Sequence, residues 1–119
     1  MAERCLIVDD NMRFLDAARS TLERQGIQVV GTATTTAEAL RQAEELRPDI
    51  VLVDISLGDE SGFELTRRLV DDLCSRVVLI STRAEDDYAD LVATSPAVGF
   101  LSKSQLSASA LRKLLSGES

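Results

Sequence analysis

The sequence predicts an α/β fold: a doubly wound, parallel sheet of five strands flanked by five helices. Short apolar runs alternate along the chain with segments whose apolar residues recur at helical spacing, and this alternation occurs five times. The clearest run, residues 50–53, is apolar throughout, which is typical of a strand buried on both faces of a parallel sheet. Four runs also lead into acidic, hydroxyl or amino side chains, which parallel strands would bring to one edge of the sheet.

The expected strands follow these apolar runs in order along the chain. They lie at residues 5–8, 27–33, 50–54, 77–81 and 98–102. The second alternates only weakly between apolar and polar residues, so we expect it nearer an edge of the sheet. The polar, glycine-containing residues 56–60 predict a loop directly after the third strand.

The expected helices are marked mainly by their capping residues. The first begins at Asn11 and the last at Ser107. Thr35 and Ser61 each stand three residues before a glutamate, the capping-box pattern in which both side chains satisfy free backbone amides at a helix start. The fourth helix, residues 85–94, has a thin apolar face, so we expect it to be the least stable.

Length, charge and cysteine content restrict the class of protein. The 119 residues fit one domain, spanning residues 1–119. With 20 acidic and 13 basic residues the net charge is -7, so we expect no nucleic-acid binding by this domain. Cys5 and Cys74 lack CxxC spacing and there is no histidine, which argues against zinc. No apolar run approaches a membrane span, and we expect a soluble, cytoplasmic protein with no membrane contact.

The residues at the strand ends form a candidate site for phosphoryl chemistry. Asp9 and Asp10 follow the first strand and Asp54 ends the third, and such carboxylates repel one another unless a cation or shared protons lie between them. Oxygen ligands without histidine or thiolate favour Mg²⁺, or the similar ion Mn²⁺. A carboxylate can itself attack a phosphoryl group and form an acyl phosphate. Ser81 and Lys103 would then supply the hydroxyl and ammonium groups that position and neutralise it.

The order of these motifs resembles the receiver domain of two-component response regulators from one end of the chain to the other. The motifs are Val8-Asp9-Asp10-Asn11 after the first strand, Asp54 after the third, Ser81 after the fourth and Lys103 after the fifth, with Phe100 three residues before that lysine. The resemblance implies the flavodoxin-like strand order 2-1-3-4-5. It also implies that the protein is a phosphorylation-dependent signalling switch.

The resemblance further implies which groups hold the phosphoryl group and the metal ion. Asp54 is the expected phosphoacceptor, and its donor is a sensor histidine kinase or a phosphotransfer protein. Mg²⁺ or Mn²⁺ would be held by Asp9, Asp10, Asp54 and the backbone carbonyl of Ser56. A receiver domain of this kind is not expected to be an enzyme acting on a separate substrate. It assists its own phosphotransfer and dephosphorylation.

Three further residues carry the expected switch and its output. By the resemblance, Lys103 pairs with the phosphate, Ser81 is the switch hydroxyl that moves toward it, and Phe100 is the switch aromatic that moves with Ser81. The change would reach the surface of the fourth helix, fifth strand and fifth helix, where an output partner or a second copy binds. The polar residues 116–119 look like the start of a linker. The expected output is transcription regulation, through a DNA-binding domain beyond this point, and a stand-alone receiver is the alternative.

The chain departs from the commonest receiver pattern at several positions. Ser81 stands where threonine is frequent and keeps the hydroxyl, whereas Phe100 replaces a common tyrosine and loses the phenolic hydrogen bond. Ser104 follows the lysine where many receivers have proline, a feature similar to receivers attached to LuxR/NarL-type transcription factors. Ser56 and Arg83 stand at positions that influence how long the acyl phosphate survives in the family.

Other functions would use parts of the same pattern. A phosphatase of the haloacid dehalogenase type also forms an aspartyl phosphate, but that family needs Asp-x-Asp after its first strand, and residues 9–12 lack it. A flavodoxin-like nucleotide binder shares the topology, yet two aspartates after the first strand would repel a flavin phosphate. A receiver-like interaction module that works without phosphate is the remaining alternative, and the intact set of site residues argues against it.

Single residues of the pattern also have simpler interpretations. Asp9 and Asp10 could cap a helix, Lys103 could be a surface lysine paired with an aspartate, and Phe100 could serve only core packing. The acidic residues 85–87 fit a solvated helix start better than a second metal site. Only the convergence of several strand ends favours the functional interpretation over these.

Overall fold

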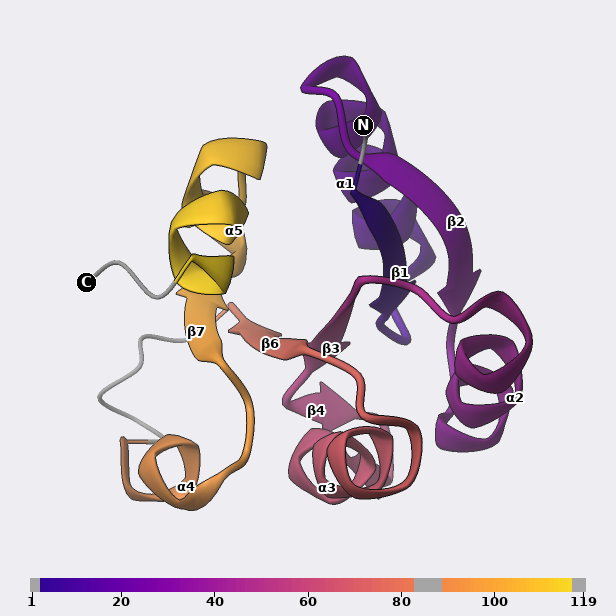
Figure 1. The fold of residues 1–119 in the computed structure, drawn as a ribbon, viewed down its shortest axis with the longest axis vertical. Coiled ribbons are helices and arrows are strands. Elements are labelled where there is room, and N and C mark those ends of the chain that lie inside the picture. The colour runs from indigo at the N-terminus through magenta and orange to yellow at the C-terminus, as the bar shows by residue number, and fades with distance from the viewer. Residues whose placement is uncertain (1–2, 83–88, 117–119) are drawn as a thin grey trace.

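The computed structural model describes residues 3–82 and 89–116 of the chain. Five parallel strands form one sheet, and helices cover both of its faces (Figure 1). The order of the strands is β2-β1-β3-β6-β7. This is the predicted order 2-1-3-4-5 once the short strands β4 and β5, which form a separate hairpin, are left out of the numbering. The predicted fold class is therefore confirmed.

The elements alternate as the apolar pattern predicts. The strands of the main sheet are β1 (Arg4–Val8), β2 (Gln28–Ala33), β3 (Ile50–Asp54), β6 (Val77–Ser81) and β7 (Gly99–Ser102). The helices are α1 (Met12–Arg24), α2 (Thr36–Leu46), α3 (Gly62–Leu73), α4 (Ala89–Thr94) and α5 (Ala108–Leu115). A single 3₁₀ turn, Lys103–Gln105, leads from β7 toward α5.

Two apolar layers form because successive strand residues point to opposite faces of the sheet. Cys5 and Ile7 of β1 pack in the layer under α1 and α5, whereas Leu6 and Val8 pack in the layer under α2 and α3. All four side chains are fully buried. Burial on both faces explains why these strands read as continuous apolar runs. The parallel pairing of β1, β3 and β6 places their carboxyl ends at one edge of the sheet.

The capping residues predicted from the sequence begin their helices. Asn11 Oδ1 accepts hydrogen bonds from the backbone N–H groups of residues 13 and 14, at 3.0 and 3.2 Å. The hydroxyls of Thr35, Ser61 and Ser107 accept from the backbone N–H three residues later, at 3.2, 3.4 and 3.0 Å. These bonds satisfy amides that have no partner within the helix. The helix starts are thus set by local sequence.

One predicted loop is an antiparallel hairpin. Residues 56–60 were expected to be irregular, but Ser56–Leu57 (β4) pairs with Glu60–Ser61 (β5) around Gly58, whose φ is +62°. Leu57 is 3% exposed and joins the core layer under α2 and α3. The Glu60 carboxylate accepts a 2.8 Å hydrogen bond from the Thr36 backbone N–H at the start of α2. Both contacts hold the hairpin beside the carboxyl end of β3.

Two predictions concern the second half of the chain. The fourth helix was expected over residues 85–94, and its described part is the six-residue α4. Arg83, Tyr88 and the acidic residues 85–87 lie outside the described residues. The fifth strand begins at Gly99, one residue later than expected, although the Val98 N–H still donates to Val77 O at 2.8 Å. None of the helices in the described ranges has the length and apolar character that crossing a membrane requires.

Candidate functional site

The carboxylates that follow β1 and end β3 come together at one edge of the sheet. Asp9 is fully buried and Asp54 is 7% exposed, whereas Asp10 points to solvent at the rim. Asp9 Oδ1 accepts a 2.8 Å hydrogen bond from the Asn11 N–H, and Asp54 Oδ1 accepts one of 3.1 Å from the Ser56 N–H. Each buried carboxylate therefore has one oxygen fixed by the loop that follows its strand and one oxygen facing the site.

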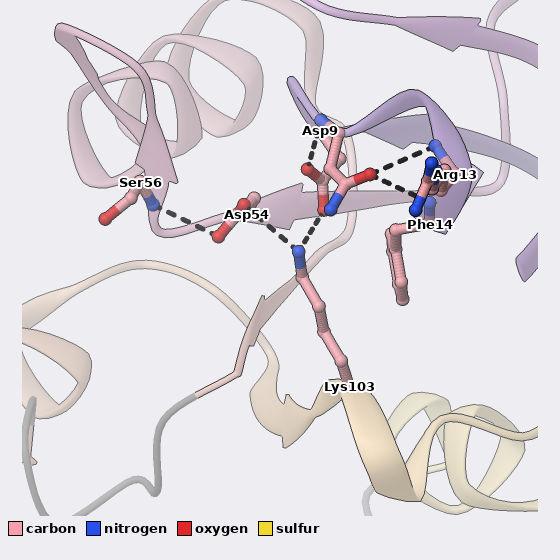
Figure 2. Close-up of polar contacts among 7 residues, drawn as sticks. Asp9, Arg13, Phe14, Asp54, Ser56 and Lys103 are labelled. Atoms are coloured by element: carbon pink, nitrogen blue, oxygen red, sulfur yellow. Dashed lines mark hydrogen bonds and ion pairs between the residues drawn. The ribbon is translucent and has the colours of Figure 1, made fainter.

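Lys103 reaches this pair of carboxylates from the carboxyl end of β7. Its Nζ lies 2.5 Å from Asp9 Oδ2 and 3.3 Å from Asp54 Oδ2, and its side chain is only 12% exposed (Figure 2). In the sequence, Lys103 is 94 positions from Asp9 (103 − 9) and 49 positions from Asp54 (103 − 54). The parallel topology thus brings together Asp9, Asp10, Asp54 and Lys103.

The three carboxylates are close enough to share a cation. One oxygen from each of Asp9, Asp10 and Asp54 lies within 4.8 Å of the others. Asp9 Oδ2 is buried and accepts no hydrogen bond from the described residues, so the Lys103 ammonium is its compensating charge there. With all groups ionised, three negative charges face one positive charge. An oxygen-only donor set with excess negative charge fits Mg²⁺ or Mn²⁺.

The environment of Asp54 disfavours its ionised form. Burial and the neighbouring Asp9 charge raise the pKa of Asp54 to about 6, against the opposing effects of Lys103 and the Ser56 N–H. A divalent cation at the cluster would favour the ionised form.

Two other predicted site residues lie on the neighbouring strands. Ser81 ends β6 and is 4% exposed, and β6 pairs with β3 so that Ile80 stands opposite Asp54. Phe100 lies in β7, and its half-buried side chain packs against the core layer under α2 and α3. Ser81 is therefore at the same sheet edge as the carboxylates, whereas Phe100 lies within the strand. The structure places Phe100 where core packing alone accounts for its burial.

The segment after Lys103 has an ordinary backbone. No cis peptide bond occurs in residues 3–82 or 89–116, so the bond between Lys103 and Ser104 is trans. Ser56 begins the β4–β5 hairpin two residues after Asp54 and has an exposed side chain. Its backbone thus lies next to the acidic cluster, as a carbonyl ligand would require.

Sequence reasoning missed two residues of the site. Phe14 of α1 lies beside Lys103, with the ring centroid 4.3 Å from Nζ. Gly62 begins α3 directly against β3, where an added Cβ would stand 2.1 Å from the Asp54 carbonyl oxygen. The position of Phe14 just outside the apolar stripe of its helix was a weak signal for the first. No local pattern indicates the second, because the close approach depends on tertiary packing.

Comparison with known proteins decides which family has this arrangement. Residues 5–116 match the family described as "Response regulator receiver domain". The chain belongs to this family. The match covers all five strands of the receiver domain except the first residue of β1, and it includes every residue of the site described above. The resemblance inferred from the motifs is thereby confirmed.

The relatives of this receiver domain include regulators from several bacteria. The response regulator GacA of Pseudomonas viridiflava is 34% identical over 108 residues, which cover 84% of this chain and 48% of GacA. The transcriptional regulatory protein KdpE of Mycobacterium tuberculosis is 40% identical over 80 residues, 67% of this chain and 35% of KdpE. The receiver domain thus spans about half, or less, of the length of these relatives.

Solved structures agree with the family. A two-component response regulator of the LuxR family from Aurantimonas has a TM-score of 0.87 and 27% identity, covering 99% of this chain and 88% of that one. A CheY-like receiver domain protein from Methanospirillum hungatei has a TM-score of 0.81 and 25% identity, covering 98% and 94%. These similarities extend over the whole sheet and its helices.

Proposed function

We propose that this receiver domain is a cytoplasmic signalling switch operated by phosphorylation of Asp54. The observation that carries the proposal is the convergence of Asp9, Asp54 and Lys103, with Nζ within 3.3 Å of both buried carboxylates. The phosphoryl donor is a sensor histidine kinase or a phosphotransfer protein, the partners that family membership supports. A second carboxylate and an ammonium at the reacting group are what phosphoryl transfer to an aspartate needs.

The metal site of the proposal is formed by groups around Asp54. Asp9, Asp10, Asp54 and the backbone carbonyl of Ser56 would hold Mg²⁺ or Mn²⁺, which neutralises negative charge on the phosphoryl oxygens when bound. Buried Asp9 Oδ2, which accepts no hydrogen bond from the described residues and has Lys103 as its cationic neighbour, supports this assignment. The exposed position of Asp10 leaves the cluster open to solvent, so that an ion can enter.

The proposed reaction depends on the different contacts of the two oxygens of the Asp54 carboxylate. The Ser56 N–H fixes Oδ1, and Oδ2 lies toward Lys103. A carboxylate oxygen attacks the phosphorus of a phosphohistidine, the new O–P bond forms, the P–N bond breaks, and the imidazole leaves with its electron pair. Lys103 then pairs with a phosphoryl oxygen. The domain assists its own phosphotransfer and later hydrolysis, in which water takes the phosphoryl group.

The switch would pass from Asp54 along β6 and β7. Added negative charge attracts the Ser81 hydroxyl at the end of β6, and Phe100 on β7 repacks with it. The affected surface consists of α4, β7 and α5. Leu91 of α4 is 52% exposed, and Val98, directly before β7, is 41% exposed. An output domain or a second copy of the chain would bind there. The transcriptional regulators among the relatives support an output in transcription.

The proposal is tested by phosphorylation with a small donor. With Mg²⁺ and acetyl phosphate, the protein should gain one hydroxylamine-labile phosphate, and with beryllofluoride it should form a stable complex. Asp54→Asn should abolish both responses. Asp59→Asn, which removes an exposed carboxylate of the nearby hairpin, is the matched control and should respond as the wild type does.

The same experiment separates the alternatives. Sustained release of phosphate from an added ester would identify a phosphatase instead of a switch. No response to either reagent would favour an interaction module that works without phosphate. Sizing with and without beryllofluoride tests the second copy, and a monomer under both conditions would count against phosphorylation-dependent dimerisation.

A further inference from the structure

Phe14 lies near the start of α1, outside the buried stripe of that helix. The stripe consists of Leu15, Ala18 and Leu22, which are at most 4% exposed, whereas Phe14 is only partly buried at the margin of the core. Its ring has a specific charged neighbour, because Nζ of Lys103 lies 4.3 Å from the ring centroid. A cation at this distance over an aromatic face is attracted by the negative charge of the π system.

Among the residues that the structure describes, three groups lie close to the Lys103 ammonium. Two neighbours are carboxylate oxygens, Asp9 Oδ2 at 2.5 Å and Asp54 Oδ2 at 3.3 Å. The third is the ring of Phe14. An ammonium carries three donors and no acceptor, and of these three contacts the one with Asp54 Oδ2 is a hydrogen bond, the one with Asp9 an ion pair and the one with Phe14 a cation–π contact. The flexible four-carbon stem of lysine would otherwise allow many positions of the charge.

We propose that Phe14 is a positioning residue for Lys103, whose ring face holds the ammonium against Asp9 and Asp54. The inference deepens the proposed function and rests on it, because the ammonium must already stand beside Asp54 when a phosphoryl group arrives. The side chain that fixes Lys103 comes from α1, and the lysine comes from the other end of the sequence. Local sequence around Lys103 therefore does not determine where its charge lies.

The space beside the Phe14 ring indicates what the Lys103 ammonium would contact if the ring were removed. A shallow groove of about 190 Å³ adjoins both the ring and the lysine. Its lining residues are Phe14, Ala17, Ala18, Thr21, Lys103 and Leu106. Water in this groove could solvate the ammonium once the aromatic face is gone. An aliphatic side chain of similar size would keep the core contact and lose the attraction for the cation.

Three variants separate the aromatic face from core packing. Phe14→Leu keeps an apolar side chain and removes the π system, and Phe14→Tyr keeps an aromatic face. Phe63→Leu is the matched control, since Phe63 is also partly buried but packs in the core layer on the opposite face of the sheet. A purely structural role predicts similar consequences from Phe14→Leu and Phe63→Leu.

The first measurement follows the lysine directly. The sequence contains only two lysines, Lys103 and Lys113, so lysine labelled with ¹⁵N at Nζ gives two NMR signals. Relaxation is measured in EDTA, without any phosphoryl analogue. We expect an ordered Lys103 nitrogen in the wild type, a more mobile one in Phe14→Leu, and restored order in Phe14→Tyr. The exposed Lys113 is the internal reference and should not change.

The second measurement concerns the oxyanion that Lys103 would meet. Beryllofluoride affinity at saturating Mg²⁺ should fall about threefold to tenfold in Phe14→Leu and recover in Phe14→Tyr. Affinity for Mg²⁺ alone should not fall, because an ammonium that is held less firmly competes less with the cation for Asp9 and Asp54. A fall in both affinities would indicate general damage to the site and would overturn the proposal.

Different results would contradict the role of Phe14 and the proposed phosphorylation of Asp54. The inference is wrong if the Lys103 nitrogen keeps its wild-type order in Phe14→Leu, if Phe63→Leu loosens it equally, or if beryllofluoride affinity does not change. Failure of the wild type to bind beryllofluoride would refute phosphorylation of Asp54. The metal-free lysine measurement would then still show whether the ring holds the ammonium.

Discussion

At the residue scale, the surroundings of Asp54 disfavour the ionised form of its carboxyl group. Burial and Asp9 raise its pKa to about 6, and the attraction of Lys103 offsets only part of that effect. Ionised Asp54 therefore costs the folded protein free energy when no metal ion is bound. The same excess of negative charge favours a cation at the cluster. The raised pKa of Asp54 and the expected attraction of the cluster for a cation thus have one electrostatic cause.

This setting predicts an unusual pH dependence for the metal-free protein. Because the folded pKa of Asp54 is above its ordinary value of 3.8, the folded state binds the proton more tightly than the unfolded state does. The cost of ionisation is fully present above about pH 6 and is relieved as the pH falls toward 3.8. We expect the free energy of unfolding in EDTA to rise by about 1 kcal/mol between pH 7 and pH 5, after solvent screening is allowed for.

Urea denaturation of the wild type and Asp54→Asn at several pH values would measure this term. The variant should lose the rise, because it has no carboxyl group to protonate. The window ends at pH 5 because another carboxylate acts in the opposite sense below it. Arg112 lowers the pKa of Glu3 to about 2, and that stabilising contribution is lost as the pH falls from 4.5. Equal slopes for wild type and variant would contradict the prediction.

At the scale of elements, the site depends on how closely α3 begins beside β3. The Gly62 N–H donates to the Ile55 carbonyl at 2.9 Å, and Thr66 Oγ1 donates to the Gly62 carbonyl at 2.7 Å. Thr66 is fully buried, and the two hydrogen bonds fix the first turn of α3 through both the N–H and the carbonyl of Gly62. The β4–β5 hairpin spans the connection from Asp54 to Gly62. Backbone contact between strand and helix thus holds Asp54 in place.

Gly62→Ala should disrupt this junction. The new Cβ would lie 2.1 Å from the Asp54 carbonyl oxygen and 2.9 Å from Ile55 Cα, and backbone atoms cannot rotate away as a side chain can. We expect a loss of about 3 kcal/mol in the free energy of unfolding, at the upper end of the usual cost of overpacking. Beryllofluoride binding should weaken as well, because relief of the clash moves Asp54.

Gly31→Ala is the control, because it also adds a methyl group at a closely packed position, but against a side chain and not against backbone atoms. Its Cβ would meet the end of the Gln42 side chain at 2.3 Å, and this side chain can turn aside. The cost is then mainly the hydrogen bond from Gln42 to the Thr32 carbonyl, about 1 kcal/mol. Denaturation curves compare the two variants. A Gly62→Ala protein as stable as Gly31→Ala would show that the helix start can shift without cost.

At the scale of the whole molecule, the sequence predicts the strands of the parallel sheet and the residues that meet at their carboxyl ends. Continuous apolar runs identify buried parallel strands, and parallel strands bring their carboxyl ends to one edge, so the meeting of Asp9, Asp54 and Lys103 follows from the strand assignments. The hairpin at residues 56–61 was missed because two-residue strands carry no periodic pattern. Phe14 was missed because its contact with Lys103 joins residues 89 positions apart, from 103 − 14.

The balance of charge in the whole molecule gives the last prediction. The net charge is -7, and part of this excess is concentrated at Asp9, Asp10 and Asp54. A cation that binds the folded cluster and not the unfolded chain raises the free energy of unfolding by about 1.4 kcal/mol at tenfold excess over Kd and about 2.7 kcal/mol at a hundredfold. We therefore expect Mg²⁺ to raise Tm more than NaCl at equal ionic strength does.

Asp10→Asn separates specific binding from general screening of charge. Asp10 is exposed, so its loss should change the stability in EDTA by less than about 0.5 kcal/mol, yet it removes one of the three carboxylates of the cluster. The Mg²⁺ response of Tm should shrink strongly in this variant and persist in Asp59→Asn, which has the same net charge. If both variants kept the full response, diffuse attraction to a negative surface would explain it, and the cluster would not be the site of binding.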